Sequence, residues 1–209
     1  MKNIEDSFGF YGILTNPVKG YDYLTNILVD YEVAMIQLRM KVGTEYERLK
    51  VADSMRKIAE GSNSLLIIND YPQIALDCDA DGVHVGQGDM SVEEVRALVG
   101  EEMIVGLSTH NPNETTLSRD EAVNYVGVGP VYATPTKNIP DPTLGLETMA
   151  EMISIANRPA VTLGGIDFER LPKVLEAGAR NFSMVRPLCI SENPEVELKM
   201  ILDIQKRYI

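Results

Sequence analysis

Eight short apolar runs, separated by segments with helical spacing, restrict most strongly what this chain of 209 residues can fold into. Such runs are typical of buried strands, and apolar residues three or four positions apart are typical of helices. The predicted strands span residues 10–14, 35–38, 65–68, 82–85, 103–107, 125–128, 160–163 and 182–185. Helical spacing is clearest over residues 46–59, 92–99, 146–156, 168–177 and 194–207.

The alternation of strands and helices predicts a parallel sheet, because parallel neighbours need a crossover connection rather than a tight turn. Eight units of about 26 residues fill the chain, which favours an α/β fold of the compact (β/α)8 TIM-barrel type. A doubly wound open sheet is the main alternative. No shift in composition marks a linker, so we expect a single domain over residues 1–209.

Local signals support several helix ends. Ser91 and Glu94 form a predicted capping box, and Pro194 is expected to open the last helix. Gly100 and Gly178 are expected to close two others.

The charge of the chain excludes some classes of partner. Nineteen Lys and Arg against thirty-one Asp and Glu give a net charge of −12, which repels nucleic acid and anionic membranes. We therefore expect small-molecule substrates, with no nucleic acid and no membrane as partner, and a homo-oligomer stays possible. A polyanionic ligand would need focused cations, backbone N–H groups or a metal ion.

Cysteine usage and the start of the chain favour a cytoplasmic protein. Cys78 and Cys189 form no CxxC motif and are expected to be buried thiols, with one long-range disulfide as the alternative. The first residues lack an apolar signal segment, and no apolar run reaches the roughly 18 residues that span a bilayer.

Polar side chains follow the second predicted strand. Period-two alternation sends Gln37, Arg39 and Lys41 to the same side, so that two cations and an amide converge where the strand ends. Barrel enzymes of this type build their active sites at that end of the strands. The alternative is an edge strand that carries solvated charges.

Two carboxylates, Asp70 and Asp89, stand just beyond the next two strands. Mg²⁺ commonly takes one or two carboxylates together with substrate phosphates, so the pair suits a magnesium–diphosphate site. Each Asp has the alternative role of a helix N-cap. Asn69 precedes the first of them, and His84 is either a substrate contact or a satisfied interior histidine.

Hydroxyl and glycine residues follow the later strands. The segment at Ser108 either supplies a hydroxyl to a phosphate or caps the next helix through Ser108 or Asn111, and its residues alone do not decide between the two. Thr134, Thr136 and Lys137 form a loop suited to phosphates. A second phosphate site is predicted at Gly164-Gly165 and at the end of the eighth strand, where backbone N–H groups are available. A tight turn with positive φ is the alternative for the glycine pair. Together these features suggest two phosphorylated substrates, one of which carries a diphosphate.

Seven motifs of the sequence, in this order and at this spacing, closely resemble those of the thiamine-phosphate synthase family. They are QLRMK at 37–41, IND at 68–70, ADGVHVGQGD at 80–89, GLSTH at 106–110, GPVYATPTK at 129–137, GLE at 145–147 and GGI at 164–166. The resemblance runs from residue 11 to about residue 190 and implies a small TIM barrel. It also implies a Mg²⁺-dependent transferase that joins 4-amino-2-methyl-5-hydroxymethylpyrimidine diphosphate to a thiazole monophosphate through a pyrimidine-methyl cation. Thiamine phosphate and diphosphate are the implied products.

The resemblance also implies a role for each site residue. Catalytic contacts to the diphosphate are carried over to Arg39, Lys41, Ser108 and Lys137, and Mg²⁺ to Asp70 and Asp89. Substrate binding is carried over to Gln37, Asn69, His84, Thr134, Thr136, Gly165, Val185 and Arg186. Within that set, Gln37 is implied to hold the pyrimidine, and the N–H groups of Val185 and Arg186 to hold the thiazole phosphate.

The sequence departs from the family pattern at three positions. Met40 replaces a usual Glu but is expected to point away from Arg39, while Arg186 and Pro187 replace a Ser and a small residue. Because Pro187 has no N–H, a phosphate donor is missing there. Two alternative functions follow from the resemblance, namely a thiazole tautomerase, which shares the barrel, and a non-catalytic module that binds thiamine phosphate or pyrimidine phosphate.

Overall fold

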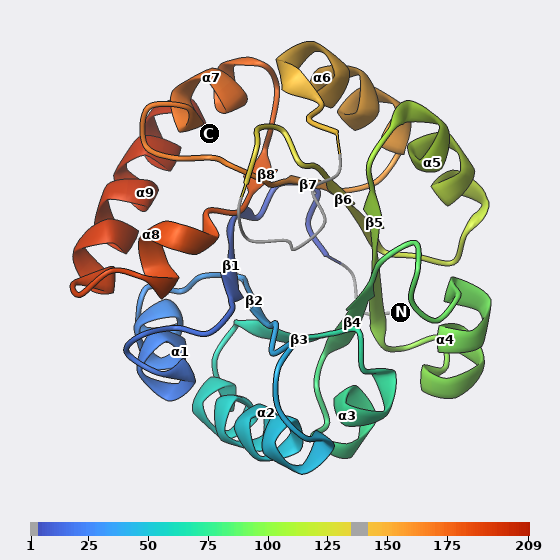
Figure 1. The fold of residues 1–209 in the computed structure, drawn as a ribbon, viewed down its shortest axis with the longest axis vertical. Coiled ribbons are helices and arrows are strands. Elements are labelled where there is room, and N and C mark those ends of the chain that lie inside the picture. Colours follow the sequence, from blue (N-terminus) through green and yellow to red (C-terminus); the bar gives the residue numbers. More distant parts are fainter. Residues whose placement is uncertain (1–3, 135–141) are drawn as a thin grey trace.

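Eight parallel strands close into a barrel in the computed structural model, which describes residues 4–134 and 142–209. Each strand pairs with its neighbours in the sequence, and β8 returns to pair with β1, as Figure 1 shows. The strands are β1 (Gly9–Leu14), β2 (Met35–Leu38), β3 (Leu65–Asn69), β4 (Gly82–Val85), β5 (Ile104–Thr109), β6 (Tyr125–Val128), β7 (Ala160–Thr162) and β8 (Asn181–Phe182). The predicted (β/α)8 barrel is therefore confirmed, and the open sheet is excluded.

Helices form a ring around the outside of the barrel (Figure 1). They are α1 (Tyr21–Asp30), α2 (Glu45–Ala59), α3 (Pro72–Asp77), α4 (Val92–Val99), α5 (Pro112–Leu117), α6 (Gly145–Ala156), α7 (Leu171–Glu176), α8 (Val185–Cys189) and α9 (Pro194–Tyr208). A short 3-10 helix, Ser118–Asp120, follows α5. Within the described ranges, we find no helix with the length and apolar character needed to cross a membrane.

The predicted helix ends at α4 and α9 are confirmed. The Ser91 hydroxyl accepts the N–H of Glu94, whose carboxylate accepts the N–H of Ser91, and Gly100 closes the helix with a φ of 74°. Pro194 stands in the first turn of α9. Both cysteines are buried and free, which confirms the thiol interpretation.

Two clusters of apolar side chains fill the molecule. The larger packs the outer faces of the strands against the helices. The smaller lies inside the barrel and consists of Tyr11, Ile13, Met35, Ile67, Ile104, Tyr125 and Val161. Gly106 makes room for the ring of Tyr125, because a Cβ at this position would lie 2.2 Å from the ring. The interior cluster forms the floor beneath the carboxyl ends of the strands.

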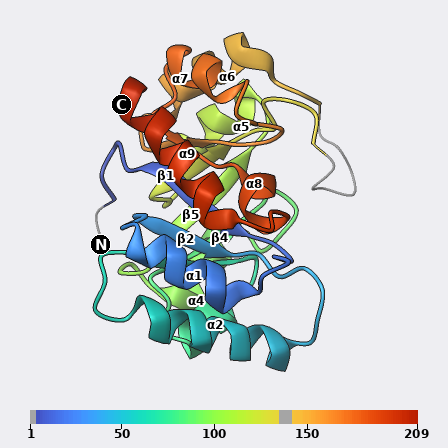
Figure 2. The ribbon, with the colours of Figure 1, turned by 90° about the vertical axis from the view of Figure 1, so that its left-hand side faces the viewer.

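The contact between β1 and β8 depends on side-chain amides, because β8 is only two residues long. Asn181 Oδ1 accepts the N–H groups of Phe8 at 2.7 Å and Gly9 at 3.1 Å. Gln205 Oε1, from α9, accepts the N–H of Phe10 at 2.9 Å. Figure 2 shows α9 and α8 side by side next to β1. The last helix thus helps to hold the first strand.

Two predicted elements were wrong in their bounds. The strand expected at 182–185 ends at Phe182, and Val185 begins the helix α8 instead. Pro187 explains this result, since its fixed φ and missing N–H suit the first turn of a helix better than a strand. The helix expected from residue 168 begins at Leu171, next to Pro172, for the same reason.

Candidate active site

One pocket opens at the carboxyl ends of the strands, and every predicted site residue that the structure describes lines it. These residues are Gln37, Arg39, Lys41, Asn69, Asp70, His84, Asp89, Ser108, Thr134, Gly165, Val185 and Arg186. Thr136 and Lys137 lie outside the described residues. The pocket has two walls of different character, from β2–β4 and from β6–β8.

Arg39 and Lys41 follow β2, which is an interior strand between β1 and β3, so the edge-strand alternative is wrong. The segment is held by Arg48 of α2, whose Nε donates to the carbonyl of Met40 at 2.9 Å. The Arg48 guanidinium also lies over the Tyr71 ring, 4.3 Å from its centroid. Met40 packs against the core, as alternation predicts. The cations are therefore supported by a residue that sequence reasoning missed.

Asp70 follows β3 in the left-handed backbone region, with a φ of 66°. Its carboxylate forms an ion pair with Lys41, and its side chain is 12% exposed while that of Lys41 is 46% exposed. Burial raises the pKa of the Asp70 carboxyl, Lys41 lowers it, and the charge and hydrogen bonding of Asp89 raise it again. Two carboxylates and one ammonium thus meet at one point of the pocket.

Neither carboxylate caps a helix, so the N-cap alternative is wrong for both. The N-cap of α3 is Tyr71, without a side-chain cap, and the N-cap of α4 is Ser91. Asp89 instead accepts the N–H of Gly86 at 2.8 Å, which fixes the turn after β4. We call Arg39, Lys41, Asp70 and Asp89 the charged wall.

A chain of hydrogen bonds crosses the floor of the pocket. Gln37 Nε2 donates to the Tyr11 hydroxyl at 2.9 Å, and the Tyr11 and Tyr125 hydroxyls are 2.9 Å apart. His84 Nδ1 is 3.0 Å from the Tyr125 hydroxyl, and His84 Nε2 is 2.9 Å from Ser108 Oγ. His84 is therefore both an interior histidine and a pocket residue, and its two predicted alternatives do not exclude each other.

Burial raises the pKa of Tyr11 and of Tyr125, so both hydroxyls stay protonated near neutral pH. Sequence reasoning treated both tyrosines as part of apolar runs. Their inward-facing positions on β1 and β6 were the available signal, because a buried tyrosine hydroxyl usually finds a hydrogen-bond partner.

The wall from β6–β8 consists mainly of backbone. Gly164 and Gly165 have φ values of 97° and 63°, so the predicted tight turn is present, and both glycines also line the pocket. A Cβ at Gly165 would lie 2.5 Å from the carbonyl oxygen of Ala133. Arg170 fixes this turn from outside, since it donates to the Gly165 carbonyl at 2.8 Å.

Ser183, just after β8, is a site residue that the sequence analysis missed. It is 2% exposed and lines the pocket, and its Oγ has no hydrogen-bond partner among the described residues. Val185 and Arg186 stand in the first turn of α8, where N–H groups have no partner within the helix. We call Thr134, Gly164, Gly165 and Ser183 the backbone wall, because glycines and short hydroxyl side chains form it.

After β5, the residue that caps the next helix is Asn111. Its Oδ1 accepts the N–H of Glu114 at 2.9 Å and begins α5, while Ser108 faces His84 in the pocket. His110 also lines the pocket, and its Nδ1 lies 3.0 Å from Glu114 Oε2.

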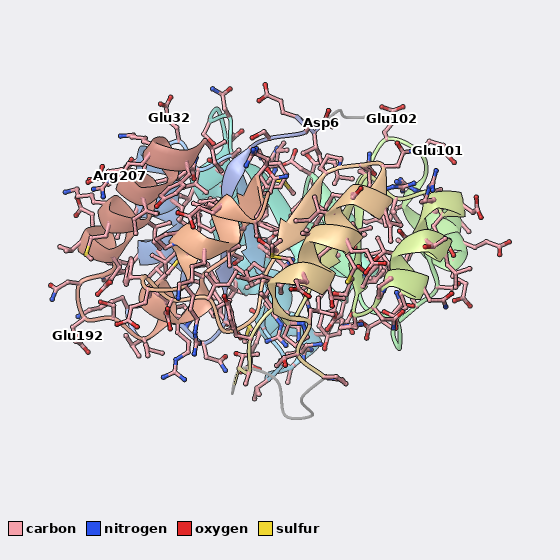
Figure 3. The ribbon with its side chains drawn as sticks, turned by 90° about the horizontal axis from the view of Figure 1, so that it is seen from above. Asp6, Glu32, Glu101, Glu102, Glu192 and Arg207 are labelled. Carbon is pink, nitrogen blue, oxygen red and sulfur yellow. The ribbon has the colours of Figure 1, made fainter. Side chains whose placement is uncertain are left out.

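The acidic excess of the chain lies partly at the other end of the barrel. Figure 3 shows Asp6, Glu32, Glu101 and Glu102 along the end at which the strands begin. The pocket end carries the cations Arg39, Lys41 and Arg186 together with the carboxylates Asp70 and Asp89. Over residues 4–134 and 142–209, no group of three or more His, Cys, Asp and Glu is arranged to hold a metal ion. A metal at the charged wall would thus draw ligands from a substrate or from water.

Comparisons with known proteins agree on one family. The model of thiamine monophosphate synthase matches residues 20–188. A thiamine-phosphate synthase of Caldicellulosiruptor bescii is 32% identical over 185 residues, which cover 88% of this chain and 84% of that protein. One of Gloeobacter violaceus is 39% identical over 160 residues, or 77% of this chain, but the match spans only 47% of that longer protein.

A solved structure has the same fold. Thiamine phosphate pyrophosphorylase from Pyrococcus furiosus superposes with a TM-score of 0.88 at 22% identity, and the match covers 97% of each chain. The barrel, the order of the motifs and the similarity to these relatives lead to one conclusion: this chain belongs to the thiamine monophosphate synthase family.

Proposed function

We propose that this chain is a Mg²⁺-dependent transferase that makes thiamine phosphate. It joins 4-amino-2-methyl-5-hydroxymethylpyrimidine diphosphate to a thiazole monophosphate and releases diphosphate. The observation that carries the proposal is the presence of two unlike walls in one pocket, one built from charged side chains and one from backbone. Family membership supports the transferase activity, and the walls support the placement of the two substrates. We expect the enzyme to work in the cytoplasm.

The charged wall suits the diphosphate group. When the bond between the pyrimidine methylene carbon and the diphosphate oxygen breaks, its electron pair stays on that oxygen and negative charge builds up there. Arg39 and Lys41 would stabilise this charge, with Ser108 and Asn69 as hydrogen-bond donors. Preorganised donors and cations lower the barrier most where charge develops in the transition state. Lys137 is proposed for the same task from the sequence alone.

Asp70 and Asp89 fit a hard divalent cation, because carboxylate oxygens are the ligands that Mg²⁺ prefers. Burial and the nearby Asp89 raise the pKa of the Asp70 carboxyl, so it costs free energy to keep both carboxylates charged. A bound cation would lower this electrostatic cost. Mg²⁺ would neutralise charge on the leaving diphosphate when bound. The ion pair with Asp70 keeps Lys41 at the same place.

The backbone wall suits the thiazole phosphate. The turn at Gly164-Gly165 allows close approach of a ligand, and Val185 and Arg186 offer N–H groups in the first turn of α8. Thr134 and Thr136 are proposed to add hydroxyl contacts. The charge of this phosphate does not change during the reaction, so binding rather than transition-state stabilisation is what the wall must supply.

The bond-forming step needs no general base in this proposal. The thiazole ring nitrogen carries the lone pair that captures the pyrimidine-methyl cation, and a carbon–nitrogen bond replaces the broken carbon–oxygen bond. Gln37 and His84 would hold the pyrimidine above the floor of the pocket, where both side chains are almost fully buried.

Product formation tests the proposal directly. The full chain is incubated with both substrates, with Mg²⁺ or with a chelator, and thiamine phosphate is separated by chromatography. We expect product with Mg²⁺, loss of product with chelator and recovery after Mg²⁺ is added back. Equal turnover with chelator would contradict the magnesium site. Binding of both ligands without any product would contradict the transferase, and isomerisation of the thiazole phosphate alone would indicate the tautomerase instead.

A further inference from the structure

The hydrogen-bond chain beneath the pocket joins side chains from five different strands. It runs from Gln37 on β2 through Tyr11 on β1, Tyr125 on β6 and His84 on β4 to Ser108 on β5. Each of its four steps is between 2.9 and 3.0 Å long. The chain therefore connects opposite sides of the barrel without a gap.

The amide of Gln37 gives this chain a direction. Its nitrogen donates to Tyr11, and an amide nitrogen can only donate. Among the described residues, Tyr125 is the other hydrogen-bond partner of the Tyr11 hydroxyl, so the single hydrogen of Tyr11 would point to Tyr125 and that of Tyr125 to His84 Nδ1. An imidazole that accepts at Nδ1 carries its hydrogen on Nε2 when neutral, and in this arrangement Nε2 would donate to Ser108.

We propose that Gln37 acts as a positioning residue that sets the tautomer of His84 and turns the hydroxyl hydrogen of Ser108 toward the pocket. Ser108 accepts from His84, so its own hydrogen is available for a ligand acceptor. Reversal of the Gln37 amide would reverse every step and would make Ser108 a donor to His84 instead. The orientation of the Gln37 amide thus decides whether the Ser108 hydroxyl donates to a ligand or to His84.

Burial keeps this direction fixed. Tyr11 is 1% exposed, Tyr125 is 0% exposed and Gln37 is 2% exposed, so water cannot easily replace a partner within the chain. Burial also raises the pKa of both tyrosines, and each hydroxyl keeps the single hydrogen that the direction requires. Hydrogen bonds in a row polarise one another, which strengthens the preference for one direction.

The consequence for catalysis rests on the proposed function. If the carbonyl oxygen of Gln37 accepts the amino group of the pyrimidine, the nitrogen of the same amide must face Tyr11. Ser108 is then a donor and can stabilise the leaving diphosphate. Recognition of the pyrimidine and stabilisation of the leaving group would be coupled through the floor of the pocket.

The tautomer of His84 can be measured without any substrate. The chain has two histidines, His84 and His110, so the ¹⁵N spectrum of histidine-labelled protein is assigned with a single His110→Asn variant. At a pH about two units above the ordinary imidazole value, we expect the wild-type spectrum to show a pyridine-like Nδ1 and a pyrrole-like Nε2 for His84. The opposite pattern in the wild type would overturn the proposal.

Gln37→Glu reverses the polarity of the chain with almost no change in shape. An ionised carboxylate only accepts, so at a pH at which the new side chain is ionised Tyr11 must donate to it, Tyr125 must donate to Tyr11, and His84 Nδ1 must donate to Tyr125. We expect the Nδ1 signal of His84 to move from the pyridine-like to the pyrrole-like range. An unchanged Nδ1 signal would mean that Gln37 does not control the tautomer.

Tyr125→Phe removes the middle of the chain and keeps the ring. In this background, Gln37→Glu should no longer move the His84 signals, because nothing transmits its effect. A shift of the same size in the double variant would show a through-space effect of the charge, which contradicts the relay. Tyr31→Phe is the matched control, since its hydroxyl bonds to Glu195 outside the barrel. This control should leave His84 unchanged.

Kinetics then separate the relay from the proposed reaction. If the enzyme makes thiamine phosphate, Tyr125→Phe should lower kcat by about tenfold while the KM for the thiazole phosphate stays within twofold, since one donor to the leaving group is lost. An unchanged kcat would overturn the coupling to the leaving group. If the protein makes no product, the spectra still decide whether the relay exists.

Discussion

The two walls of the pocket bind phosphate groups by different means. The charged wall has charged side chains, with an ion pair between Lys41 and Asp70 and a backbone segment held by Arg48, whereas the backbone wall has glycines whose positive φ angles shape a turn. Side-chain charges are effective where charge develops during a reaction, and backbone donors are effective where a fixed dianion must be held. Substitutions should therefore change turnover on one wall and substrate affinity on the other.

The largest expected effect is on the charged wall. Lys41→Ala removes a cation beside the developing diphosphate charge, so we expect kcat to fall by about a hundredfold or more. Steady-state kinetics with both substrates measure this effect. Lys19→Ala is the control, because Lys19 forms an ion pair with Glu192 outside the pocket. If the two variants have similar kcat values, Lys41 does not stabilise the leaving diphosphate.

Asp89→Asn tests the metal part of the charged wall. The amide keeps an acceptor for the Gly86 N–H but loses the negative charge, so the Mg²⁺ concentration for half-maximal activity should rise by about tenfold or more. Titration of activity with Mg²⁺ gives this value. Asp77→Asn, which changes an exposed carboxylate on α3, should leave the titration curve in place. If Asp89→Asn leaves the titration curve unchanged, Asp89 does not bind Mg²⁺ and serves only to hold the turn after β4.

Gly165→Ala tests the backbone wall. The new Cβ would lie 2.5 Å from the Ala133 carbonyl in a backbone with a φ of 63°, so the turn must shift. We expect the KM for the thiazole phosphate to rise by several-fold while the KM for the pyrimidine diphosphate changes little. Gly61→Ala has a similar φ of 76° but meets nothing within 4 Å. Gly61→Ala should lose about 1–2 kcal/mol of stability from its φ alone, Gly165→Ala should lose more because of the added contact, and only Gly165→Ala should lose affinity.

The smallest effect is expected from Arg186→Ser, which restores the residue common in the family. Arg186 is exposed at the rim of the backbone wall, so its removal should change the KM for the thiazole phosphate by about threefold and leave the other KM unchanged. Initial rates with each substrate varied in turn separate the two values. Equal changes in the two KM values would mean that Arg186 supports the fold and does not contact the thiazole phosphate.

Local periodicity predicted that Gln37, Arg39 and Lys41 lie on one side of the chain, and all three line the pocket. The contact between Tyr11 and Tyr125 could not be predicted in this way. It joins β1 to β6 across the barrel and depends on the space left by Gly106. The end of β8 was predicted as strand because its residues are apolar, and the effect of Pro187 on the local backbone was underestimated.

The contacts that β1 makes with β8 and α9 affect how the protein folds during its synthesis. During synthesis, β1 leaves the ribosome early, but the amides of Asn181 and Gln205 that bind its backbone come at the end of the chain. Until both amides are present, the backbone N–H groups of Phe8, Gly9 and Phe10 lack these partners. Removal of residues 205–209 takes away Gln205 and the end of α9, and it should for that reason lower the stability of the first strand, although these residues lie far in sequence from the charged wall.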